Sequence, residues 1–284
     1  MKYNNDVALV SMNIKFTVIA TGLCAVLFSN SAFAVRLEVP SGANFFYHFT
    51  AVLLLYAHIS GGAIGILSGM VATMTKKGSK NHRLAGKTFF WSMLICYLIG
   101  GLVAPFLDTQ QSTNFVAAIL ALYLLLSGTS TASRRCFVAG RGEKVGLIVA
   151  ALITLLGATF MILTLRHPDG SFDGSPPQAY VLFIVAGSLA LVGEIKVLYQ
   201  KKLNQTARVF RHLWRMCMSF FIASGSAFFG QAAFFPEWFN ATYLPLALGF
   251  FPLVIMVIYT IKYLYAFLKK TYVKSTEEVS SMRG

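Results

Sequence analysis

Three of the five histidines stand where an imidazole could do chemistry, namely His58, His82 and His212. A neutral imidazole can ligate haem iron, relay a proton or hydrogen-bond to a quinone. His58 lies about 16 Å inside a predicted apolar helix, at about 1.5 Å per residue. Ionisable side chains at such depth are often functional, because burying them is costly. The alternative is a neutral imidazole bonded to a hydroxyl or a backbone carbonyl of the next helix, and both interpretations stay open.

His82 and His212 lie at the membrane edge that we expect to face the cytoplasm, and each stands next to an arginine. A haem held by two histidines needs both imidazoles at one depth on facing helices. Because His58 lies deeper, His82 with His212 is the couple whose positions suit a haem. The spacing therefore predicts a site for haem b or a quinone with His82 and His212 as ligands, and His58 is a further candidate cofactor contact.

Glu194 is the one acidic residue inside a predicted span after the N-terminal leader, and arginines are its natural partners. Arg211 and Arg215 share a helix face at i, i+4, so we expect an ion pair between Glu194 and one of them. One interpretation is a cytoplasm-facing site for an anionic or redox ligand, lined by His82, Arg83, Glu194, Arg211, His212 and Arg215. The other is a belt of basic side chains that reach toward the headgroups, with one structural ion pair.

Glycines follow His58 along the same predicted helix, at Gly61, Gly62, Gly65 and Gly69. At 100° per residue the last three fall within about 40° of the His58 direction. A glycine face lets a neighbouring helix approach closely, so we expect these four glycines to serve helix packing and His58 to point into the bundle. The sequence has no Walker loop, nucleophile elbow or HExxH motif, and we assign no catalytic residue and no metal ligand.

The composition predicts the elements that must position these residues. Hydrophobic residues make up 56% of the 284 residues and charged residues 12%, with a mean hydropathy of +0.66. A soluble domain carries about twice that share of charge. The apolar residues fall in blocks of about 20, the length that crosses a bilayer as a helix. We therefore expect an all-α integral membrane protein.

Seven transmembrane helices are predicted in a domain over residues 35–272. Their expected ranges are Tyr47–Thr75, Thr88–Leu107, Phe115–Ser133, Val145–Leu165, Ala179–Tyr199, Leu213–Phe235 and Tyr243–Leu268. Residues 1–34 resemble a signal peptide, in which Ala32-x-Ala34 fits a cleavage site and Met12 is an alternative start. The other interpretation of 1–34 is an uncleaved eighth helix. We expect residues 273–284 to form a disordered cytoplasmic tail.

The placement of charge predicts orientation and partners. Nearly all of the 24 lysines and arginines fall on one alternating set of loops and helix ends, and the formal net charge is +14. This is the positive-inside pattern. It predicts a multi-pass protein of a bacterial inner membrane, with the mature N-terminus outside and the C-terminus in the cytoplasm. The bilayer and its anionic headgroups are sufficient partners for the charge, so nucleic acid is not expected. A membrane redox partner or a second copy of the chain stays open.

The motifs resemble a group of bacterial multi-pass membrane proteins defined by a domain of unknown function. The shared pattern is a His-x3-Gly helix and a Lys-Gly…His-Arg-x-x-Gly turn, here His58–Gly69 followed by Lys77-Gly78 and His82–Gly86. A later block, Arg211-His212-Leu213-Trp214-Arg215-Met216, is similar to one branch of the group. The resemblance covers roughly Tyr47 to Phe235 and implies an inner-membrane helical bundle. It marks as shared positions His58, His82, Arg83, Arg211, His212, Arg215 and Gln231, and it implies no activity.

Three classes of function are compatible with these observations. The leading hypothesis is a redox or small-ligand membrane protein that binds haem or quinone. The second is a proton-coupled transporter or channel-like protein, with His58 and Glu194 on its path. The third is a non-catalytic membrane scaffold. The sequence leaves open whether the protein is an enzyme.

Overall fold

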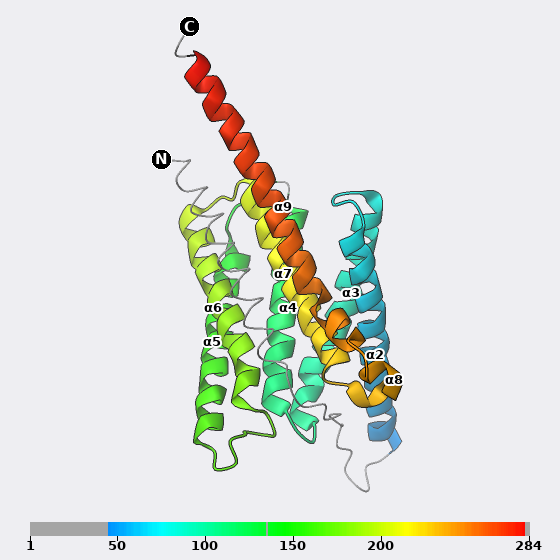
Figure 1. Ribbon diagram of the computed structural model, residues 1–284. Coiled ribbons are helices and arrows are strands. Elements are labelled where there is room, and N and C mark those ends of the chain that lie inside the picture. The colour runs from blue at the N-terminus through cyan, green and yellow to red at the C-terminus, as the bar shows by residue number, and fades with distance from the viewer. Residues whose placement is uncertain (1–44, 135, 282–284) are drawn as a thin grey trace.

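The computed structural model describes residues 45–134 and 136–281, so the predictions for residues 1–34 lie outside it. Over the described residues the protein is helical and contains no strand (Figure 1). The long helices are α2 (Phe45–Met74), α3 (Lys80–Val103), α4 (Gln111–Ser133), α5 (Arg141–Arg166), α6 (Pro177–Gln200), α7 (Gln205–Phe228) and α9 (Leu244–Ser281). Short turns of helix, η1 (Ala104–Phe106), η2 (Ala232–Phe234) and α8 (Glu237–Asn240), connect some of them.

Six of these helices are long and apolar enough to cross a membrane, which confirms the predicted helical membrane class. They are α2, α3, α4, α5, α6 and α9. The remaining long helix, α7, corresponds to the predicted span Leu213–Phe235 but begins earlier and ends earlier. Its arginines and histidine make it more polar than the other six, and it carries three of the candidate site residues, Arg211, His212 and Arg215.

The helices form a bundle with α7 at its centre. The hairpin of α5 and α6 lies on one side, the hairpin of α2 and α3 lies on the other, and α4 and α7 lie between them, while α9 crosses the front of α7 (Figure 1). The α2–α3 turn, the start of α7 and the protruding end of α9 share one end of the bundle, the upper end in Figure 1. We call this the basic end, because the turns there carry most of the loop lysines and arginines.

Glycines of α2 allow close packing of the α2–α3 hairpin. A Cβ atom placed on Gly65 would clash with the side chain of Met93 in α3, and one on Gly61 would lie 3.1 Å from the Ser92 carbonyl oxygen. Gly69 faces rings of both α3 and α7, and Gly62 faces the Sγ of Cys96. Since lipid is as apolar as these side chains, such close contacts, rather than exclusion of water, hold neighbouring helices together.

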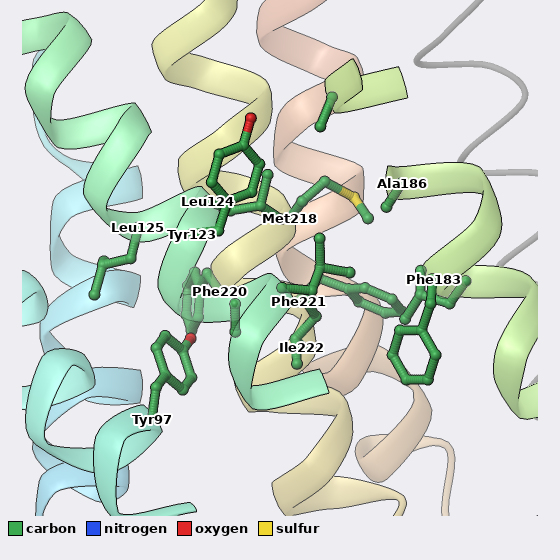
Figure 2. Close-up of a cluster of buried hydrophobic side chains, with 14 of the residues drawn as sticks. Tyr97, Tyr123, Leu124, Leu125, Phe183, Ala186, Met218, Phe220, Phe221 and Ile222 are labelled. Carbon is green, nitrogen blue, oxygen red and sulfur yellow. The ribbon is translucent and has the colours of Figure 1, made fainter. Parts of the chain in front are cut away.

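Large apolar side chains fill the centre of the bundle. Figure 2 shows Leu124 of α4 and Phe183 of α6 close to Met218 and Phe221 of α7, all buried. Polar groups in this layer are paired. The hydroxyl of Tyr97 donates to the Ser219 carbonyl at 2.6 Å, and the Ser219 hydroxyl donates to the Ala121 carbonyl at 3.0 Å. Buried hydroxyls need such partners, because an unpaired polar group in a membrane interior is costly.

The three largest differences from the predicted helix boundaries each have a local cause. Ser79 and Asn204 cap α3 and α7, since their side-chain oxygens accept the amides of His82 (3.2 Å) and Ala207 (2.8 Å). Such caps begin a helix, so the predicted turn 76–86 is helical from Lys80 onward. At the other terminus α9 continues to Ser281, through most of the stretch 273–284 for which we expected disorder. No glycine or proline follows Pro252 before Gly284 to stop it.

Candidate cofactor site and buried charge cluster

His82 lies in the first turn of α3, and the end of α2 holds its ring. Its Nδ1 is 2.9 Å from the carbonyl oxygen of Ala72, to which Lys77 Nζ also donates at 3.0 Å, together with a bond of 2.6 Å to the Thr73 carbonyl. The last carbonyls of a helix have no partner within that helix, and cationic side chains near them are favourable. A carbonyl can only accept, so Nδ1 of His82 carries a proton, and in the neutral ring the lone pair is on Nε2.

His212 of α7 is held in the same way by α4. Its Nδ1 is 3.0 Å from the carbonyl oxygen of Gly128 and therefore donates to it. Gly128 also permits the approach of α7, because a Cβ there would lie 3.0 Å from Met216 Sδ and 3.1 Å from Arg215 Cβ. The sequence analysis did not single out Gly128. The run of small residues around it, Ser127 to Ser130, is the signal that could have found it.

The two imidazoles therefore belong to one site at the basic end. His212 interacts electrostatically with both His82 and Lys77. Among the described residues nothing hydrogen-bonds to the Nε2 of either ring. Histidines that ligate metals commonly donate their other ring N–H to a carbonyl or carboxylate, which fixes the ring and leaves one nitrogen for the metal. This arrangement can ligate a haem iron, or accept the proton of a quinol hydroxyl.

Lys77 lies beside this pair, in the turn between α2 and α3. Its ammonium is 4.4 Å from the centre of the Tyr259 ring, so it joins the turn to α9. Partial burial lowers the pKa of Lys77 from its ordinary value, against a smaller opposing effect of the Cys217 thiol. A cation at this position favours ligands that carry or develop negative charge.

Next to the histidine site lies a buried charge cluster, which we define as Tyr123, Glu194, Arg211 and Arg215. Arg211 donates to both carboxylate oxygens of Glu194, at 2.9 and 2.8 Å. Arg215 donates to Glu194 Oε1 at 3.0 Å, and the hydroxyl of Tyr123 donates to the same oxygen at 2.7 Å. The sequence predicted one arginine partner for Glu194, and the structure provides two.

Hydroxyls of α4 complete the cluster. Arg211 Nε donates to Thr131 Oγ1 at 3.1 Å, and Arg215 donates to Ser127 Oγ and, at 3.1 Å, to the Tyr123 hydroxyl. A glycine of α5 makes room for the carboxylate, because a Cβ on Gly146 would lie 2.8 Å from Glu194 Oε1. The cluster thus joins α4, α5, α6 and α7 at one depth.

A second ion pair borders the cluster at the loop between α4 and α5. Arg134 Nη1 lies 2.9 Å from Glu143 Oε1. Both this pair and the cluster contact the ring of Phe137, whose centre is 5.1 Å from the guanidinium carbon of Arg134 and 5.6 Å from that of Arg211.

Other predicted site residues lie apart from these groups. His58 Nδ1 is 2.9 Å from the Cys96 carbonyl oxygen on α3. This contact fits the interpretation of His58 as an imidazole bonded to a backbone carbonyl of the next helix. Arg83 is exposed, and within the described residues no hydrogen bond or ion pair holds it. Gln231 lies near the opposite end, where its Oε1 is buried without a partner among the residues described. Within the described residues His58 hydrogen-bonds to Cys96, whereas Glu194 bonds to Tyr123, Arg211 and Arg215, so the two residues of the transport hypothesis have different hydrogen-bond partners.

Within residues 45–134 and 136–281, no group of three or more histidine, cysteine and acidic side chains could hold a metal ion. No protein-family model, curated protein or solved structure matches this chain.

Proposed function

We propose that the protein is a bacterial inner-membrane redox protein that binds a haem b between His82 and His212. The observation that carries this proposal is the matched anchoring of the two imidazoles. Each ring donates its Nδ1 proton to a main-chain carbonyl of another helix, which leaves both Nε2 atoms without a hydrogen-bond partner among the described residues. Two neutral imidazoles held in this way could ligate the iron of a b-type haem.

In this proposal α7 is the seventh span, and the basic end faces the cytoplasm. The polarity of α7 is compatible with a span, because Arg211 and Arg215 are buried against side chains of α4 and α6 rather than turned toward lipid. The loop lysines and arginines then obey the positive-inside rule, with the mature N-terminus outside. Residues 1–34 act as the signal peptide, or as an additional helix, that inserts this bundle.

The experiment is an absorption spectrum of the full chain, purified in detergent from haem-replete cells. We expect a reduced-minus-oxidised difference spectrum of b type and, by the pyridine haemochrome assay, about one haem per chain. His82→Ala and His212→Ala should each remove the signal. His58→Ala and His167→Ala are matched controls, because those rings lie against Cys96 and in the exposed α5–α6 loop. A colourless wild-type protein, or a spectrum that survives both ligand substitutions, refutes haem binding.

A quinone is the second candidate ligand, and the exposure of α2 supports it. In the most apolar stretch of α2 only 6% of the residues are buried inside the protein. A lipid-soluble ligand can therefore reach this helix from the bilayer. A free Nε2 on His82 or His212 would accept a proton from a quinol hydroxyl. Solvent extraction of purified protein, with quinone quantified by chromatography, tests this ligand. Quinone content that falls in His82→Ala and stays unchanged in His58→Ala would support it, and equal content in all variants would exclude it.

A further inference from the structure

The buried charge cluster has one more positive charge than negative. Two guanidinium groups, those of Arg211 and Arg215, face a single carboxylate, that of Glu194. Their side chains are 8%, 0% and 1% exposed, respectively. An uncompensated charge in such surroundings is strongly unfavourable, because neither water nor salt can screen it.

No other acidic side chain of the described residues neutralises this charge. Glu143 is paired at 2.9 Å with an arginine outside the cluster, Arg134. Other carboxylates with described side chains lie in the connections at the opposite end of the bundle, at Asp108, Asp169, Asp173 and Glu237.

One donor of the cluster is also unused. Arg215 Nε is buried and has no hydrogen-bond partner among the residues described. The other nitrogens of Arg215 are all engaged, with Tyr123, Ser127 and Glu194. Buried guanidinium N–H groups are normally paired, so a free one beside a surplus positive charge has the properties of an incomplete anion site.

We propose that the buried charge cluster binds one small oxyanion, a phosphate or carboxylate group, which takes the free Nε–H of Arg215 and balances the charge. Guanidinium groups suit such anions, because their N–H donors match the spacing of carboxylate and phosphate oxygens. Arg211 offers the route, since its side chain retains slight exposure at the basic end, beside Phe137. The site is separate from the cofactor site, and its occupancy does not require haem.

The test is the thermal stability of the full chain in detergent, measured while phosphate replaces chloride at constant ionic strength. Wild-type protein should show a saturable rise in Tm with sodium phosphate. Glu194→Gln keeps the shape of the side chain but makes the surplus +2, so its half-saturating phosphate concentration should fall by about tenfold or more. Arg215→Gln removes the surplus and should abolish the response. Arg83→Gln, on the exposed surface, is the matched control and should respond like wild type.

Each outcome decides the matter. A phosphate response that is the same in all four proteins is a bulk salt effect and overturns the proposal. If Arg215→Gln does not fold, Glu194→Gln decides, and an unchanged half-saturating concentration overturns it. The phosphate group can come from a lipid headgroup as well as from solution. A wild-type protein that ignores added phosphate but retains an anionic phospholipid in native mass spectrometry, lost in Arg215→Gln, identifies the lipid source. If the wild-type protein shows no phosphate response and retains no anionic phospholipid, the proposed site is refuted.

Discussion

Removal of the Glu194 charge should be far more destabilising than removal of the Glu143 charge. Both carboxylates are buried, with side chains 1% and 5% exposed, and both pair with arginines. They differ in what their loss leaves behind. Glu194→Gln leaves two guanidinium groups buried and unpaired, and breaking a buried pair in this way costs about 3–5 kcal/mol. Glu143→Gln leaves Arg134, which is 34% exposed and can turn to water, so the cost is about 0–1 kcal/mol.

The measurement is unfolding of the purified chain in mixed micelles, with the two variants compared at one pH and one salt concentration. Gln is the right replacement at both positions, because it keeps the volume and an acceptor oxygen for Tyr123 in one case and for the Gly140 amide in the other. In the double variant Glu194→Gln/Arg215→Gln, part of the loss should be recovered, because one of the two unpaired charges is gone. Equal effects of Glu194→Gln and Glu143→Gln would refute the reasoning, because burial of the partner would then not matter.

Three further predictions concern helix packing, a hydrogen bond between α7 and α9, and pH. Gly65→Leu should destabilise the α2–α3 hairpin by about 1–3 kcal/mol through overpacking, whereas Gly86→Leu, where a Cβ meets no atom within 4 Å, should be tolerated; unfolding in micelles distinguishes them. Ser224→Ala should cost about 1 kcal/mol, because the Ser224 hydroxyl donates at 2.9 Å to a carbonyl of α9 close to Pro252, and hydrogen exchange of the α9 amides in that turn should increase. Burial lowers the folded-state pKa of Lys77 below its ordinary 10.5. At pH values between the lowered folded-state pKa and the ordinary pKa of the unfolded chain, the unfolded chain binds more protons than the folded one. The free energy of unfolding should therefore rise with pH in that interval. Lys77→Met should reduce that slope, and an identical slope in both proteins would contradict the assignment.

Much of the architecture is determined by the sequence alone. Blocks of about 20 apolar residues can cross a bilayer only as helices, because a helix satisfies its own backbone groups. The glycine spacing of α2 likewise predicted its packing face, since glycines three and four apart fall on one side of a helix. The early starts of α3 and α7 were also within reach of the sequence. Ser79 and Asn204 are ordinary capping residues, and hydropathy alone had placed both starts too late.

Only the tertiary structure decided the composition of the site. Tyr123, Gly146, Glu194 and Arg215 come from four helices, and no periodicity within one helix reveals which other helix its polar face meets. The sequence could offer Glu194 one arginine partner, but packing of α7 against α4 brought two arginines to it, together with a tyrosine and, among the described residues, no second carboxylate. It also turned both histidine rings onto carbonyls of other helices. These properties depend on rotation and depth of whole helices, which contacts between helices fix only when the bundle is assembled.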